Sequence, residues 1–182
     1  DTLYVDQLLR WIQTSSLDAL VILAQELVYD EHGNLQEELG IAYVPNDYVL
    51  KLAKQHKQFL PAISIHPARR DALDELEKGI AEGAVMMKCL PNCQNIDTSD
   101  RRYIPFWEKM AAARLPLLAH TGGEHTVPVV NAAYADPKRL RLPLECGVTV
   151  IAAHCATKSG ALDPDYFDDW RKMLREFPNL FG

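Results

Sequence analysis

The sequence has no run of about 18 consecutive apolar residues, the length that would indicate a membrane-spanning helix. It also has no basic stripe with interleaved aromatic residues, and its formal net charge at pH 7 is −6. Because this charge repels a phosphate backbone, nucleic acid is not an expected partner, and the lack of a long apolar run argues against a membrane. Hydrophobic residues make up 48% of the 182 residues, a composition typical of a globular chain with a sizeable core.

Cysteines are few, and no two are spaced as C-x-x-C. The four thiols, Cys89, Cys93, Cys146 and Cys155, lie beside or within expected strands and not in a small disulfide-rich module. A structural zinc site would need further well-spaced ligands, which the sequence does not offer. The chain begins with Asp1, so its ends need not be natural, and it shows no signal peptide. Reduced thiols and a cytoplasmic location are therefore expected.

Apolar periodicity alternates between the strand type and the helical type along the chain. Short aliphatic runs predict strands at about 17–24, 60–66, 84–88, 115–120, 148–154 and 179–182. Amphipathic patterns predict helices at about 4–15, 46–57, 73–83, 103–110 and 167–174, with a cap at Asn46 and a long loop at 25–45. This order, without Asn-Gly or Asp-Gly hairpin turns, predicts an α/β fold with a parallel sheet. No composition break divides the chain, so residues 1–182 are expected to form a single domain.

Several expected strands end at side chains that can do chemistry, namely His66, Lys88, His120 and His154. Catalytic groups of parallel barrels stand at the carboxyl ends of strands, and adjacent strands lie about 4.7–4.9 Å apart, so such side chains can converge on one metal ion. A lone histidine at a strand end is more often a hydrogen-bonded structural residue. His120 and His154 each close an apolar run and open a loop of small residues, which favours a shared site. For His66, metal binding, substrate contact and structural hydrogen bonding have comparable weight.

The segments around these residues carry a resemblance to a known family. They are Leu17–Leu23 (LDALVIL), Met87–Pro91 (MKCLP), Leu117–Glu124 (LLAHTGGE) and Val150–Cys155 (VIAAHC). In that order they resemble strands two, four, five and six of the amidohydrolase superfamily, in its amidohydrolase-related branch. In that branch, histidines that end strands five and six bind metal, and in some members a carboxylated lysine on strand four bridges two metals.

The resemblance implies a (β/α)₈ barrel of the TIM-barrel type, present here as an incomplete barrel with strands two to six and the start of strand seven. The family's first strand with its His-x-His pair, and its strand-eight aspartate, would lie outside residues 1–182. It implies one or two divalent metal ions, zinc above all, with His120 and His154 as ligands. The complete protein would then be a metal-dependent hydrolase that uses metal-activated water on an amide, lactone or similar carbonyl substrate. The segment alone would be inactive.

Several roles stay open on this interpretation. Lys88, the catalytic candidate, would either be carboxylated and bind metal or remain a free amine that binds a substrate carboxylate. Glu124 and His125, in the loop after strand five, are candidate substrate contacts like His66, with loop hydrogen bonding as the alternative. Two other functions fit the same scaffold: a metal-dependent decarboxylase of an aromatic or unsaturated carboxylic acid, and a non-catalytic barrel with structural histidines. The expected partner is a small-molecule substrate, and a homo-oligomer is compatible with the sequence.

Overall fold

Helices and strands alternate in the structure, a computed structural model that describes residues 2–39 and 42–182. The strands are β1 (Leu20–Leu23), β2 (Phe59–Ile63), β3 (Met86–Cys89), β4 (Leu117–His120), β5 (Val150–Ala153) and β6 (Leu180–Phe181). The α-helices are α1 (Thr2–Thr14), α2 (Asn46–Gln55), α3 (Ala72–Ala81), α4 (Pro91–Gln94), α5 (Ile104–Ala112), α6 (Arg141–Glu145) and α7 (Phe167–Glu176). Short 3₁₀ segments are η1 (Glu37–Leu39), η2 (Arg101–Tyr103), η3 (Ala132–Ala135), η4 (Pro137–Leu140) and η5 (His154–Ala156).

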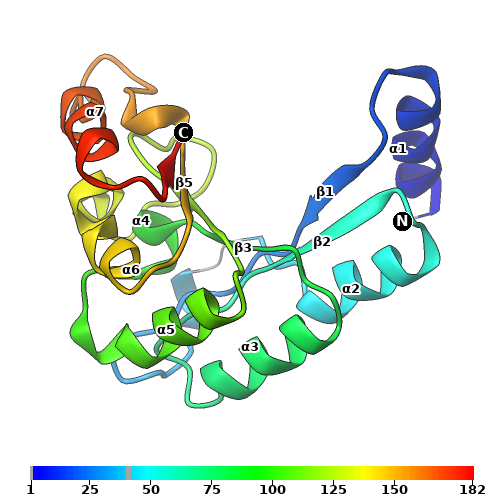
Figure 1. Ribbon diagram of the computed structural model, residues 1–182, viewed down its shortest axis with the longest axis horizontal. Coiled ribbons are helices and arrows are strands. Elements are labelled where there is room, and N and C mark those ends of the chain that lie inside the picture. The colour runs from blue at the N-terminus through cyan, green and yellow to red at the C-terminus, as the bar shows by residue number, and fades with distance from the viewer. Residues whose placement is uncertain (1, 40–41) are drawn as a thin grey trace.

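The strands form one six-stranded parallel sheet in chain order. Each connection between neighbouring strands contains a helix, because parallel strands can be joined only by a crossover. Figure 1 shows α2, α3 and α5 following one another along one side of the strands, with α6 and α7 beside β5. The predicted parallel α/β arrangement is therefore confirmed. Within the described ranges, no helix has the length and apolar character needed to cross a bilayer.

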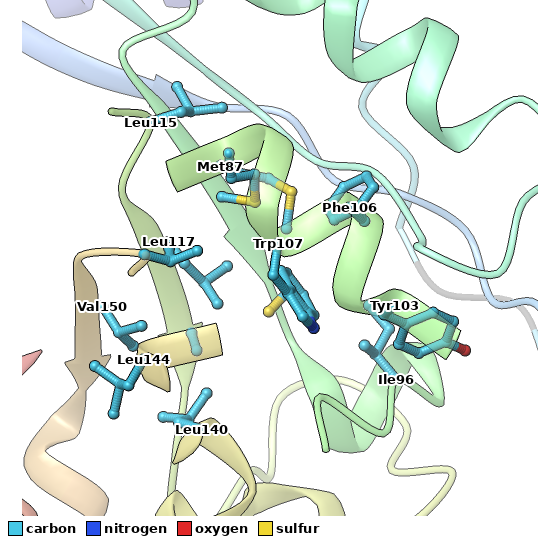
Figure 2. Packing of buried hydrophobic residues seen from close by; sticks show 14 of the residues in the cluster. Met87, Ile96, Tyr103, Phe106, Trp107, Leu115, Leu117, Leu140, Leu144 and Val150 are labelled. Carbon is cyan, nitrogen blue, oxygen red and sulfur yellow. The ribbon is translucent and has the colours of Figure 1, made fainter. Parts of the chain in front are cut away.

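One face of the sheet packs against these helices and forms the core. Met87, Leu117 and Val150 lie on this face of β3, β4 and β5, and each is fully buried. Figure 2 shows them near Trp107 of α5, whose side chain is also fully buried. Successive side chains of a strand point to opposite faces of the sheet, so every second residue lies in this core.

The opposite face, called the inner face below, holds the alternate residues of the same strands. By register it includes Val21, Leu23, Leu60, Lys88, Leu118, His120, Ile151 and Phe181. Several of these side chains are apolar and substantially exposed, Leu23, Leu60 and Phe181 among them. The inner face therefore combines an accessible apolar surface with the strand-end residues singled out in the sequence.

Several strands end earlier than predicted, β2 and β5 among them. The strand expected at 60–66 ends at Ile63, because Ser64 exchanges backbone hydrogen bonds with the Asn46 side chain: Ser64 N donates to Oδ1 (2.8 Å), and Asn46 Nδ2 donates to Ser64 O (3.0 Å). The predicted cap at Asn46 is therefore wrong, and Pro45 occupies the capping position of α2. The strand expected at 148–154 ends at Ala153. The predicted loop at 25–45 is irregular apart from η1 and two isolated bridges, and its residues 40 and 41 lie outside the described residues.

Candidate functional site

The strand register brings the candidate residues of β3, β4 and β5 to one edge of the inner face. Lys88 pairs with Leu118, and His120 follows Leu118 by two residues, so both side chains point to the same side of the sheet. His120 pairs with Ala153, the residue that precedes His154. The carboxyl edge of these strands therefore carries Lys88, His120 and His154 together.

The imidazoles of His120 and His154 lie next to each other at this edge, in an edge-on arrangement. Their ring centroids lie 4.9 Å apart, and the ring planes meet at 61°. His120 is buried, with Nδ1 at 3.8 Å from Oε2 of Glu124. Its other nitrogen, Nε2, is buried and makes no hydrogen bond within the described part of the chain. A buried imidazole nitrogen without a partner is costly unless something else binds it.

Burial and neighbouring positive charge keep His120 neutral. Burial is the largest cause that lowers its pKa, Lys88 and His154 act in the same direction, and Glu124 acts in the opposite direction, so that the pKa falls from 6.5 to about 4. At neutral pH the ring therefore has a free lone pair on one nitrogen, the state in which imidazole binds a metal.

His154 lies in a strained turn directly after β5. His154, Cys155 and Ala156 all have left-handed backbone conformations, with φ of 67°, 51° and 55°. Each non-glycine residue in this conformation costs on the order of 1–3 kcal/mol of stability, and such strained residues cluster at functional sites. The turn leaves the His154 side chain exposed at the edge of the inner face.

Lys88 lies beside His120 in a half-buried position. Its Nζ donates a hydrogen bond to the backbone carbonyl of Cys89 at 3.2 Å. Burial lowers the pKa of Lys88, and the nearby Cys89, Cys93 and Glu124 counteract this effect. Burial also raises the pKa of both thiols to about 12, so neither is a thiolate at neutral pH. Lys88 is thus an amine near His120 with one backbone hydrogen bond.

The loop after β4 holds both Glu124 and His125. Burial alone would raise the pKa of Glu124, but hydrogen bonds from Thr126 and Val127, together with His120, lower it to about 2. This fixed carboxylate faces His120 and does not project freely into solvent. His125 is exposed, and its Nε2 lies 2.9 Å from Oδ2 of Asp163, which ties this loop to the loop after β5.

His66 lies in different surroundings from the other candidates. It is fully buried after β2, its Nδ1 accepts a hydrogen bond from Ala68 N (3.1 Å), and its ring lies 5.3 Å from that of Tyr29. Burial lowers its pKa to about 4, although the carbonyl groups of Gln94 and Asn95 act to raise it. The two buried histidines are affected by different charges. Arg69 and Asp30 act on the pKa of His66, whereas Lys88, His154 and Glu124 act on the pKa of His120.

Two features of this edge were missed in the sequence. Glu26 is buried after β1, and its Oε2 lies 2.6 Å from Nη1 of Arg69, whose other nitrogens bind Asp71. The partners are 43 positions apart in sequence, so no local pattern indicates the pair. Thr121 is buried and bonded to the loop after β5. A threonine after a strand-end histidine has no distinctive sequence signal.

The described residues provide only part of a metal-ligand set. Among residues 2–39 and 42–182, no group of three or more His, Cys, Asp or Glu side chains is arranged to hold a metal ion. The two neighbouring imidazoles are borderline ligands of the kind that zinc prefers. Zinc sites use at least three protein ligands, so a metal here would need further donors.

A sequence profile described as amidohydrolase matches residues 13–182. No curated protein resembles the chain closely enough in sequence to count as a match. One similar solved structure is a putative 2-pyrone-4,6-dicarboxylic acid hydrolase from Pseudomonas putida, with a TM-score of 0.61 and 13% identity, covering 96% of this chain and 56% of that one. Another is an amidohydrolase from Mycobacterium avium subsp. paratuberculosis K-10, with a TM-score of 0.53 and 13% identity, covering 94% and 51%.

The parallel βα architecture, with its strand-end residues gathered at one edge, defines an α/β protein of the TIM-barrel-like class, present as an incomplete barrel. The chain belongs to the amidohydrolase family. This confirms the resemblance seen in the sequence. The chain spans about half the length of the solved structures that it resembles.

Proposed function

We propose that the complete protein is a metal-dependent hydrolase of an amide, lactone or similar carbonyl compound. The observation that carries this proposal is the neighbouring pair His120 and His154 at the carboxyl edge of β4 and β5, with ring centroids 4.9 Å apart. This is the edge at which parallel barrels place their catalytic groups. Membership of the amidohydrolase family supports the hydrolytic reaction class.

The donor chemistry of the two histidines fits a divalent metal, with zinc as the proposed ion. His120 Nε2 is buried without a hydrogen-bond partner in the described residues, and a pKa of about 4 keeps its ring neutral. Nδ1 lies 3.8 Å from Oε2 of the Glu124 carboxylate, which is longer than a hydrogen bond but places a negative charge beside this nitrogen. The remaining ligands are proposed to come from outside the described residues, as the family resemblance implies.

The residues of this chain then have distinct roles. A bound divalent cation would supply Lewis acidity and lower the pKa of a water ligand from 15.7 to about 7. His120 and His154 hold the cation, and the Glu124 carboxylate places a negative charge near the His120 ring. Lys88, which is half-buried beside His120, is placed to bind a substrate carboxylate or the oxygen on which charge develops. A small carbonyl compound that carries a carboxylate is therefore the substrate class that we favour.

Lys88 also favours a second candidate function. A buried amine beside a metal site can hold the carboxylate of an aromatic or unsaturated acid, which a metal-dependent decarboxylase would release as carbon dioxide. The neighbour from Pseudomonas putida is named as a putative hydrolase of a pyrone dicarboxylic acid, which accords better with hydrolysis. Product analysis on lactone and carboxylic acid substrates distinguishes the two, because only the decarboxylase releases carbon dioxide.

Substitution of His154 tests the metal site. In the complete protein, His154→Ala should remove most bound metal and turnover while leaving the circular dichroism spectrum unchanged, because the side chain is exposed and outside the core. Metal content by mass spectrometry and turnover on a lactone panel provide the readouts. His32→Ala is the matched control, since its side chain is 71% exposed in the loop after β1. A His154→Ala protein with native metal content and turnover would contradict the proposal. A native protein that binds no metal would favour a barrel with structural histidines.

A further inference from the structure

The turn that carries His154 is connected to β4 by one buried hydroxyl group. Thr121 follows His120 directly and is only 2% exposed. Its Oγ1 donates a hydrogen bond to the Ala153 carbonyl at 2.6 Å and accepts one from the Ala156 amide at 3.0 Å. These two backbone groups lie on either side of His154, so a single side chain fixes both ends of the strained segment.

The next residue brings the two loops into direct backbone contact. Gly122 has φ of +84°, and a Cβ at this position would lie 2.1 Å from the Thr157 carbonyl oxygen. Thr157 in turn donates its amide and its hydroxyl to the carbonyl of His154, at 3.1 Å and 2.8 Å. Thr121 and Gly122 therefore hold the turn against the strand that carries His120.

We infer that Thr121 is a positioning residue for His154, an inference that rests on the proposed metal-binding function. Three consecutive left-handed residues persist only where their surroundings hold them. The Thr121 hydroxyl is the group that binds both flanks of this segment, and it belongs to the residue after His120. It therefore links the position of one imidazole to that of the other and keeps the two rings in their edge-on arrangement.

Three variants of the complete protein test this role. Thr121→Val has nearly the same shape but lacks the hydroxyl, whereas Thr121→Ser retains it. Thr98→Val is the matched control, because Thr98 is also buried (1% exposed) and its Oγ1 also donates to a backbone carbonyl, that of Arg139 at 2.9 Å. The readouts are the affinity for Zn²⁺ by chelator competition and the absorption spectrum of the Co²⁺-substituted protein.

Thr121→Val should lower Zn²⁺ affinity about 10- to 100-fold, the usual effect of removing a group that orients a metal ligand. It should also change the Co²⁺ spectrum, while Thr121→Ser and Thr98→Val stay near native on both readouts. Native affinity in Thr121→Val would overturn the inference. So would an equal loss in Thr98→Val, because that would be a general effect of destabilisation.

A separate measurement keeps this inference distinguishable from the proposed function. If the native protein binds no divalent metal, the proposed function fails, and amide hydrogen exchange of the metal-free protein then decides the role of Thr121. Faster exchange in Thr121→Val, confined to residues 154–157, would support the positioning role. Unchanged exchange, or an increase spread over the whole sheet, would overturn it.

Discussion

His66 illustrates how burial alone can set the chemistry of a side chain. Its ring has no exposed surface, and one nitrogen accepts the Ala68 amide hydrogen. Because Nδ1 is an acceptor, the proton of the neutral ring must reside on Nε2. A second proton would have to bind Nδ1, where it would meet the amide hydrogen of Ala68, so protonation of the buried ring is unfavourable. The ring is therefore held neutral by its surroundings.

We expect the stability of the protein to fall as the pH drops from about 6.5 to about 4. The pKa of His66 is about 4 in the folded state and 6.5 when the ring is unperturbed, so the unfolded chain binds more protons in this window. At about 1.4 kcal/mol per pKa unit, the loss is on the order of 3 kcal/mol for this residue. His120, with a similar pKa, adds to it.

Urea denaturation at pH values across this window measures the effect. His66→Gln should lower the stability at pH 7 but flatten its pH dependence, because the titrating ring is gone. NMR titration of the native protein should show the His66 ring neutral until about pH 4. A ring that protonates near pH 6.5 without loss of stability would contradict this account.

The sequence could place these histidines at or shortly after strand ends but could not describe their surroundings. An apolar run that stops at a polar residue predicts the end of a strand, and this is a local property. The environment of His66 depends on Tyr29 and Gln94, which lie far from it in the chain and meet it only in the folded protein. The pairing of His120 with His154 was predictable because strand order follows chain order in a parallel sheet. The hydroxyl contacts of Thr121 were not predictable, because they depend on the backbone of a distant loop.

At the scale of elements, three helices end in the same left-handed turn. The left-handed residue is Gly83 after α3, Arg114 after α5 and Gly147 after α6. Each turn has the same pair of backbone hydrogen bonds, such as Gly83 N to Ile80 O (3.1 Å) and Ala84 N to Gly79 O (2.9 Å). This is the common glycine-terminated helix end, except that α5 uses an arginine.

The two kinds of helix end should respond differently to alanine. Gly83→Ala should lower the free energy of unfolding by about 1 kcal/mol, the cost of a left-handed L-residue. Nothing lies within 4 Å of a Cβ placed there, so the effect is conformational and not steric. Arg114→Ala should change stability by less than about 0.5 kcal/mol, because Arg114 is exposed and already bears the left-handed cost.

Chemical denaturation of both variants alongside the native protein provides the measurement. Equal destabilisation by the two substitutions would show that the left-handed conformation is not the cause. A large loss in Arg114→Ala alone would point to an interaction of the arginine side chain.

The ends of helices and strands are only partly predictable from local sequence patterns. The glycine at 83 correctly indicated the end of α3, whereas no local pattern predicts a left-handed arginine at the end of α5. The strand at 60–66 was predicted too long because apolar character continues through Ile65, while the hydrogen bonds of Ser64 are taken by Asn46, 18 positions earlier. The strand ending at His154 was one residue too long because the left-handed turn interrupts the extended backbone.

For the molecule as a whole, the inner face of the sheet is the main unusual feature. Leu23, Leu60 and Phe181 are 42%, 37% and 51% exposed, although they lie on strands. In closed barrels such positions are filled by layers of side chains from several strands. An accessible apolar sheet face of this kind favours association with another apolar surface.

We therefore expect the 182-residue chain, made on its own, to self-associate through its inner face. Leu23→Ser/Leu60→Ser should weaken this association at least about tenfold, since a fully buried leucine contributes about 1.5–3 kcal/mol and tenfold corresponds to 1.4 kcal/mol. Sedimentation velocity over a range of concentrations gives the association constants.

The matched control is Leu3→Ser/Leu162→Ser. It removes two leucines that are more exposed, 87% and 99%, but lie on α1 and in the loop after β5 and not on the inner face. If association depended on total exposed apolar surface, this control would weaken it more than the inner-face variant does. If the inner face is responsible, the control should leave the association constant near its native value. A native chain that sediments as a monomer at every concentration would contradict the role assigned to this face.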